Sequence, residues 1–108
     1  MYRVLLVEDD RQIREVIGDY FGRRDQIALD FAEDGNIGLA KILNELYDLI
    51  VLDIMMPGED GIEILRKLKS SPATKAVPVI MVSAKGSEYD KITGLDCGAD
   101  DYISKPFG

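Results

Sequence analysis

The sequence predicts an α/β fold in which a parallel sheet carries helices on both faces. Short apolar runs alternate along the chain with segments of helical periodicity. Strands and helices that alternate in this way form right-handed crossovers, so the strands pair in parallel. The run at 49–52 is continuously apolar and rich in β-branched residues, which is typical of a strand buried on both faces.

The first half of the chain predicts two strands, each followed by a helix. The strand at 3–7 leads into a helix at 11–24. The strand at 27–31 is interrupted by Asp30, which favours a place near the sheet edge, and the next helix is expected at 34–46. Spacings of three and four residues define the two expected buried faces: Ile13, Val16, Ile17 and Tyr20 in one helix, and Ile37, Ala40, Leu43 and Tyr47 in the other.

The second half begins with the central strand at 48–52, which Asp53 ends, and a loop broken by Pro57-Gly58. A helix at 60–69, a strand at 77–82, a helix at 87–97 and a strand at 101–104 follow. The helix at 60–69 is expected to bury Ile64, Leu65 and Leu68, and the helix at 87–97 Ile92 and Leu95, with Gly98 as its C-cap.

No helix follows the fifth strand, so we expect an apolar patch to remain exposed on the sheet. A truncation, a fragment of a longer protein and a form completed by another chain are equally compatible with this ending.

Composition narrows the classes of function. A chain of 108 residues, 46% hydrophobic, predicts one domain with a real core. A net charge of −7 argues against nucleic-acid binding, and no apolar run is long enough to span a bilayer. We expect no signal peptide, and the single Cys97 suits a reducing cytoplasm. Because histidine is absent, Ser-His-Asp arrangements and histidine zinc sites are excluded, and any metal should be a hard cation held by oxygen.

Polar residues follow four of the predicted strands. Glu8-Asp9-Asp10 ends the first, Asp53 the third and Ser83 the fourth, and Lys105 follows the fifth. The carboxyl ends of parallel strands share the edge at which α/β proteins bind ligands. Two like charges about 4 Å apart repel by roughly 4 kcal/mol at an effective dielectric near 20, so converging acids need a cation such as Mg²⁺. This combination suits phosphoryl transfer, in which a carboxylate such as Asp53 can be the nucleophile.

Each of these residues also has an ordinary explanation. Acidic residues often complement a helix N-terminus, and Asp10 is the one expected to serve only as a cap. Ser83 alone would be a turn residue, Lys105 a solvated charge and Tyr102 a core aromatic. The cation site is favoured because Glu8-Asp9-Asp10 places three acids in succession at the tip of a buried strand.

Four stretches match the motifs of a known family in order and spacing: residues 4–10, residues 52–58 with Asp60-Gly61, residues 78–84 and residues 98–107. On these stretches the chain resembles the receiver domain of bacterial two-component response regulators. The resemblance implies a flavodoxin-like, doubly wound sheet of order 2-1-3-4-5. It covers residues 1–108 as one receiver domain that stops where the last helix of that fold begins.

The resemblance implies a Mg²⁺-dependent phosphoacceptor. Asp53 would take a phosphoryl group from a phosphohistidine on a sensor histidine kinase or phosphotransfer protein. Asp9, Asp53 and the main-chain carbonyl of Met55 would bind Mg²⁺, or Mn²⁺ in its place, directly. Glu8 would bind the ion mainly through water.

Roles for the remaining strand tips are implied in the same way. Ser83 and the Ala84 amide would hydrogen-bond the phosphoryl oxygens, and Lys105 would pair with their charge. Ser83 and Tyr102 would form a switch that remodels the surface of residues 87–104 for dimerisation or contact with an effector.

The expected function is therefore a cytoplasmic signalling domain that catalyses only its own phosphorylation and dephosphorylation. Residues 100–107 are similar to those of receivers joined to winged-helix DNA-binding domains, which implies transcription regulation. Three other functions compete with this one. A phosphatase of the haloacid-dehalogenase type needs a second Asp where Met55 stands. In an FMN carrier, Glu8-Asp9-Asp10 would repel the phosphate. A pseudo-receiver that only binds partners would not need these acids, Ser83 and Lys105.

Overall fold

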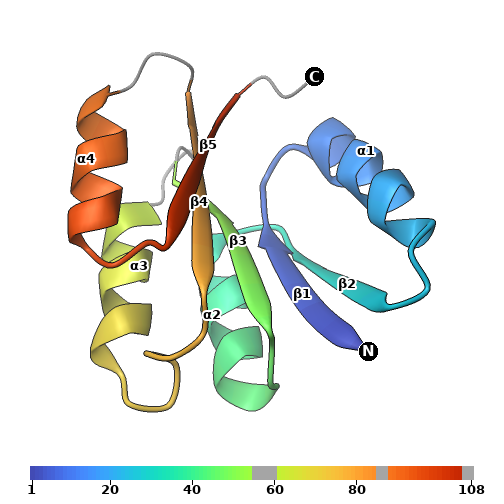
Figure 1. Ribbon diagram of the computed structural model, residues 1–108, viewed down its shortest axis with the longest axis horizontal. Coiled ribbons are helices and arrows are strands. Elements are labelled where there is room, and N and C mark those ends of the chain that lie inside the picture. Colours follow the sequence, from blue (N-terminus) through green and yellow to red (C-terminus); the bar gives the residue numbers. More distant parts are fainter. Residues whose placement is uncertain (55–60, 85–87, 106–108) are drawn as a thin grey trace.

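A five-stranded parallel sheet forms the centre of the molecule, with helices on both faces (Figure 1). The computed structural model describes residues 1–54, 61–84 and 88–105, and of residues 83, 84, 88–91, 104 and 105 it describes the backbone alone. The strands are β1 (Tyr2–Val7), β2 (Ile27–Ala32), β3 (Leu49–Asp53), β4 (Val79–Ala84) and β5 (Asp101–Lys105). The helices are α1 (Arg11–Gly22), α2 (Gly35–Asn44), α3 (Gly61–Ser70) and α4 (Glu88–Asp96).

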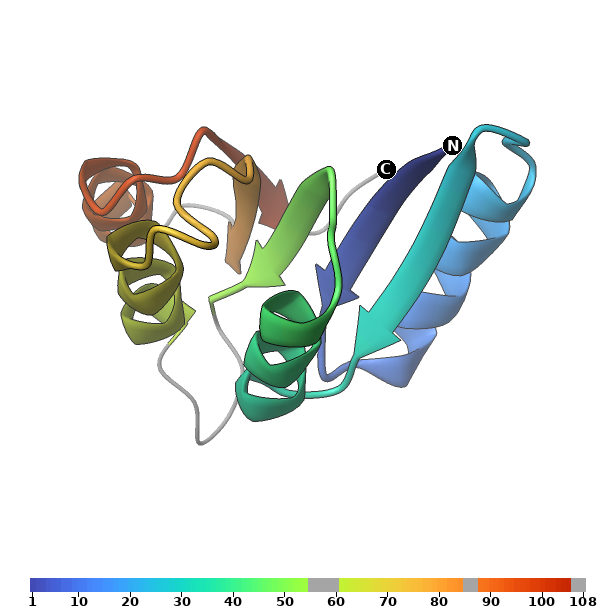
Figure 2. The same cartoon turned by 90° about the horizontal axis from the view of Figure 1, so that it is seen from below.

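The strand order is β2-β1-β3-β4-β5, and every neighbouring pair is parallel. This confirms the predicted fold class and order. The edge position of β2 also confirms the prediction based on Asp30. Helices α2, α3 and α4 lie side by side on one face, and α1 packs on β2 on the other (Figure 2).

The core lies between the sheet and the layer formed by α2, α3 and α4. Alternate residues of β1, β3 and β4 point into it, and α3 contributes its predicted buried face. The buried side chains from these elements are Leu5, Val7, Ile50, Leu52, Ile64, Leu65, Leu68, Val79 and Met81.

The opposite face of the sheet is covered unevenly. In the described residues, α1 contacts β2, and no helix lies over β4 and β5 on this side. Tyr102 packs against the core, so by the alternation of a strand Ile103 points to the opposite face, where it is exposed. An apolar side chain is therefore exposed on the part of the sheet where we expected it. No helix in the described parts of the chain has the length and apolarity needed to cross a bilayer.

The buried stripe predicted for α2 is confirmed only at Tyr47, which follows the helix and is buried, and the buried face predicted for α4 was wrong. Ile37 and Leu43 of α2 are 42% and 61% exposed, and Ile92 and Leu95 of α4 are exposed as well. Each helix instead turns a glycine toward the sheet, as Gly38 of α2 illustrates. A Cβ atom on Gly38 would lie 2.8 Å from Val7 Cγ2, and close approach of the backbones selects this face over the larger side chains.

The predicted face of α1 is confirmed only in part. Ile13 and Ile17 are half-buried, whereas Val16 and Tyr20 are exposed. The helix contacts β2 along one narrow side, so the wider apolar stripe remains in solvent.

Candidate functional site

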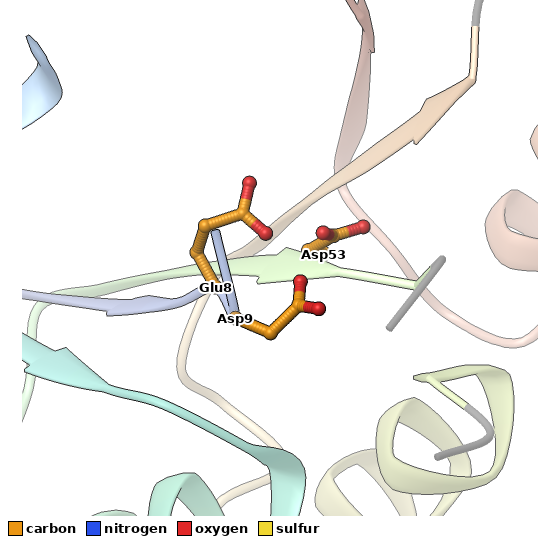
Figure 3. A group of neighbouring side chains, drawn as sticks. All are labelled: Glu8, Asp9 and Asp53. Carbon is orange, nitrogen blue, oxygen red and sulfur yellow. The ribbon is translucent and has the colours of Figure 1, made fainter. Parts of the chain in front are cut away.

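Glu8, Asp9 and Asp53 meet at the carboxyl edge of the sheet. Val7 of β1 lies beside Leu52 of β3, so the residues that follow them in the chain are neighbours. Each of the three acids offers a carboxylate oxygen, and these oxygens all lie within 4.8 Å of one another. Figure 3 shows the three side chains turned toward a common space. The predicted convergence of these acids is confirmed.

Two of the three acids are buried. Glu8 and Asp53 are each 1% exposed, and Asp9 is exposed. Burial of ionised carboxylates is costly, and like charges at this spacing repel each other by several kcal/mol, on the order of 4 for a pair about 4 Å apart. A divalent cation bound among the oxygens would offset both terms.

The donor set fits a hard cation. Carboxylate oxygens are the ligands that Mg²⁺ takes in proteins, and Mg²⁺ retains waters or phosphate oxygens at its other positions. Glu8, Asp9 and Asp53 supply the carboxylates. The side chains present therefore fit a Mg²⁺ site.

Backbone and side-chain hydrogen bonds hold the segment that carries Glu8 and Asp9. The Glu8 amide donates to Ala32 O at 3.0 Å, which extends the pairing of β1 with β2 by one residue. Asp10 Oδ1 accepts from the amides of Gln12 at 2.8 Å and Ile13 at 3.3 Å, which confirms the prediction that Asp10 caps the helix.

Asp53 is held by the sheet itself. It lies beside Val82 in the register of β3 and β4, and the Ile54 amide donates to Val82 O at 3.0 Å. The carboxylate therefore projects from the last residue of a strand paired on both sides. This fixes the backbone at Asp53.

The other predicted site residues come from the ends of β4 and β5. Ser83 lies beside Ser104 and Ala84 beside Lys105 in the strand register, so all these positions reach the same sheet edge. The side chains of Ser83 and Lys105, and Met55 entirely, lie outside what the structure describes. Tyr102 is half-buried against the core.

Sequence reasoning missed Arg14. Its Nη1 atom donates to the main-chain oxygen of Glu8 at 2.7 Å, so it contacts the segment that carries the acids. A signal was present in the sequence, because a cation in the first turn of a helix lies at the end where the helix dipole disfavours positive charge. Such a residue needs a local partner, and here the partner is the Glu8 carbonyl.

The chain is similar to known proteins over nearly all of its length. The response regulator receiver domain family matches residues 4–108. The transcriptional regulatory protein ResD of Bacillus subtilis is 46% identical over 105 residues, which are 97% of this chain and 42% of ResD. The response regulator ArlR of Staphylococcus haemolyticus is 42% identical over 107 residues, which are 99% of this chain and 47% of ArlR. The chain thus spans less than half the length of these relatives.

Solved structures agree with the fold. The receiver domain of the Francisella response regulator 1452 superposes with a TM-score of 0.88 at 40% identity, over 100% of this chain and 87% of that one. The Mn²⁺-bound form of response regulator Rcp1 gives a TM-score of 0.90 at 25% identity, over 100% of this chain and 84% of that one.

Proposed function

The chain belongs to the response regulator receiver domain family of two-component systems, and from this premise we propose that Asp53 is its phosphoacceptor. The donor is a phosphohistidine on a sensor histidine kinase or a phosphotransfer protein, and the reaction depends on Mg²⁺. The observation that carries the proposal is the convergence of Glu8, Asp9 and Asp53 within 4.8 Å at the sheet edge.

Glu8, Asp9 and Asp53 would hold the cation, with the Met55 carbonyl as a further ligand. When bound, Mg²⁺ neutralises the charge that the carboxylates and the phosphoryl group bring together. Mn²⁺ serves in its place, a proposal supported by the Mn²⁺-bound structure of Rcp1.

The chemical step is a displacement at phosphorus. A carboxylate oxygen of Asp53 attacks the phosphorus, a new O–P bond forms, and the N–P bond to the donor imidazole breaks. The electron pair of the broken bond returns to the imidazole nitrogen. The backbone at Asp53 is fixed by the sheet, so the contribution of the protein is mainly to position the attacking oxygen.

Groups at the ends of β4 and β5 complete the site in this proposal. Lys105 pairs with the charge of the phosphoryl group, and the Ser83 hydroxyl and Ala84 amide hydrogen-bond its oxygens. Movement of Ser83 with reorientation of Tyr102 then changes the surface of residues 87–104. This surface serves for dimerisation or for contact with an effector.

The output of the signal is inferred from the relatives of this chain. ResD is named as a transcriptional regulatory protein, and we infer that this receiver, residues 1–108, controls transcription through a DNA-binding domain outside this sequence. The net charge of −7 argues against direct DNA binding by the receiver itself. We place it in the cytoplasm, where it catalyses only its own phosphorylation and dephosphorylation.

Incubation with Mg²⁺ and acetyl phosphate, followed by intact mass measurement, tests the proposal. We expect one phosphoryl adduct per chain, which is absent in EDTA and in Asp53→Asn. Asp34→Asn is the matched control, since Asp34 caps α2 through the Ile37 amide and Asn is an equally good cap.

Three outcomes would contradict the proposal. An adduct that persists in Asp53→Asn would place the chemistry on another residue. A folded wild-type chain that forms no adduct would exclude phosphoryl transfer from this donor. Turnover of many phosphate esters per chain would indicate a phosphatase.

A further inference from the structure

Glu8 is anchored on both sides of its backbone. Its amide donates to Ala32 O at 3.0 Å, and its carbonyl accepts from Arg14 Nη1 at 2.7 Å. The carbonyl belongs to the peptide plane that joins Glu8 to Asp9. Arg14 therefore fixes the orientation of the peptide that connects two of the three acids in the cluster.

The segment is also fixed on the far side of Asp9. Asp10 caps α1 through the Gln12 and Ile13 amides, and the Arg14 amide donates to Asp10 O at 3.0 Å. Asp9 is thus flanked by two anchored residues, and Arg14 contacts both, through its guanidinium and through its amide. Preorganised backbone of this kind holds metal ligands in place before the ion arrives.

The surroundings of Arg14 indicate that the carbonyl is its main partner. The side chain is half-buried, and among the described residues no carboxylate lies within ion-pair distance of its guanidinium. Arg11, one turn earlier, differs on both points. Its side chain is 83% exposed and its Nε pairs with Glu15 at 3.1 Å. The two arginines carry the same charge and lie three residues apart near the N-terminus of α1, but only Arg14 contacts the segment that carries Glu8 and Asp9.

We propose that Arg14 is a positioning residue for the cation site, which orients the Glu8–Asp9 peptide so that both side chains meet Asp53. This inference rests on the proposed function, because it assumes that Mg²⁺ binds the cluster. The inference also predicts the direction in which Mg²⁺ affinity changes when Arg14 is replaced. Loss of a positive charge near a cation site should by itself strengthen cation binding. Loss of an outer partner that orients ligands should weaken it, typically by 10–100-fold.

Calorimetric titration with Mg²⁺ tests this inference. The titration compares the wild type with Arg14→Met, Arg14→Lys and Arg11→Met. Methionine keeps a long side chain and a good helix propensity, so the two Met variants remove the same charge with little change to α1. We expect Arg14→Met to bind Mg²⁺ about 10-fold more weakly. Arg11→Met should bind as the wild type does or slightly more tightly. Arg14→Lys should recover most of the loss, since an ammonium group keeps the charge and a donor.

The NMR chemical shift of the Asp9 amide in the metal-free protein provides a second readout. It should change in Arg14→Met and remain unchanged in Arg11→Met, because only the Arg14 substitution releases the Glu8–Asp9 peptide. Unfolding in EDTA checks that each variant is folded. If Arg14→Met is not folded, Arg14→Leu replaces it in the test, with Arg11→Leu as its control and the same expected loss of Mg²⁺ affinity.

Failure of this inference can be distinguished from failure of the proposed function. If the wild type binds Mg²⁺ and Arg14→Met binds it as tightly as Arg11→Met does, this inference is wrong and the proposed function stands. If the folded wild type binds no Mg²⁺, the inference and the proposed function are both wrong.

Discussion

At the scale of single residues, the acidic cluster places carboxylates at buried positions that a protein core usually fills with apolar side chains. Glu8 and Asp53 are each 1% exposed and share their surroundings with a third carboxylate. Hydrophobic side chains of similar size would serve a core better at these positions. The Mg²⁺ that we propose would supply positive charge to these carboxylates.

A second group of polar residues lies at the opposite end of the sheet and stabilises it. Arg3 Nη2 pairs with Asp30 Oδ2 at 3.0 Å and Glu45 Oε1 at 2.7 Å, and its guanidinium lies 4.8 Å from the centre of the Tyr47 ring. The Tyr47 hydroxyl donates to Asp30 Oδ2 at 2.8 Å. These contacts join β1, β2 and the segment that leads from α2 to β3. Burial, with a contribution from the bond to Asp30, raises the pKa of Tyr47 above its ordinary value.

Tyr47→Phe should lower the free energy of unfolding by about 1 kcal/mol at pH 7, because it removes the hydrogen bond to Asp30. A raised pKa means that the folded state favours protonated Tyr47. This stabilisation is complete below the ordinary tyrosine pKa of about 10 and is lost as the pH rises toward the folded-state value. The difference between wild type and Tyr47→Phe in urea unfolding should therefore narrow from pH 7 to pH 11. A constant difference would contradict this assignment.

At the scale of the elements, the sequence predicts the position of each helix better than its orientation. Periodicity counts large apolar residues, so it favoured Ile37 and Leu43 as the buried side of α2. The sheet instead selects the face on which the backbones approach most closely. In α4 the residue at this contact is Gly94, whose added Cβ would clash with Met81 Sδ. Such contacts depend on which strand each helix meets, and the sequence does not reveal this.

Gly38→Ala tests the close contact of α2 with β1. Alanine favours a helix over glycine by about 1 kcal/mol, but its Cβ would meet the stiff side chain of Val7 at 2.8 Å. Overpacking costs about 1–3 kcal/mol, so the net result should be a loss of about 1 kcal/mol in urea unfolding. Gly22→Ala is the matched control, since a Cβ there has nothing within 4 Å and should stabilise α1. Equal stabilisation by both changes would mean that the contact is unimportant.

At the scale of the whole molecule, the alternation of strands and helices was enough to predict a parallel sheet and its ligand-binding edge. The meeting of Glu8, Asp9 and Asp53 follows from that geometry, because parallel strands end on the same side. The strand order was implied by the family resemblance, since alternation alone is compatible with several orders. Arg14 was missed because its partner is a main-chain carbonyl. A cation near a helix N-terminus signals that a local partner is needed, but the sequence does not show which group that partner is.

The free energy of unfolding with and without Mg²⁺, measured in the wild type and in Asp53→Asn, tests the central claim most directly. In EDTA, Asp53→Asn should be the more stable protein by about 1 kcal/mol or more, because it removes one of the crowded charges. Mg²⁺ at about 100 times its dissociation constant should stabilise the wild type by about 2.7 kcal/mol and the variant far less. A wild type that Mg²⁺ does not stabilise, and that is more stable than Asp53→Asn in EDTA, would contradict the claim that these acids form a cation site.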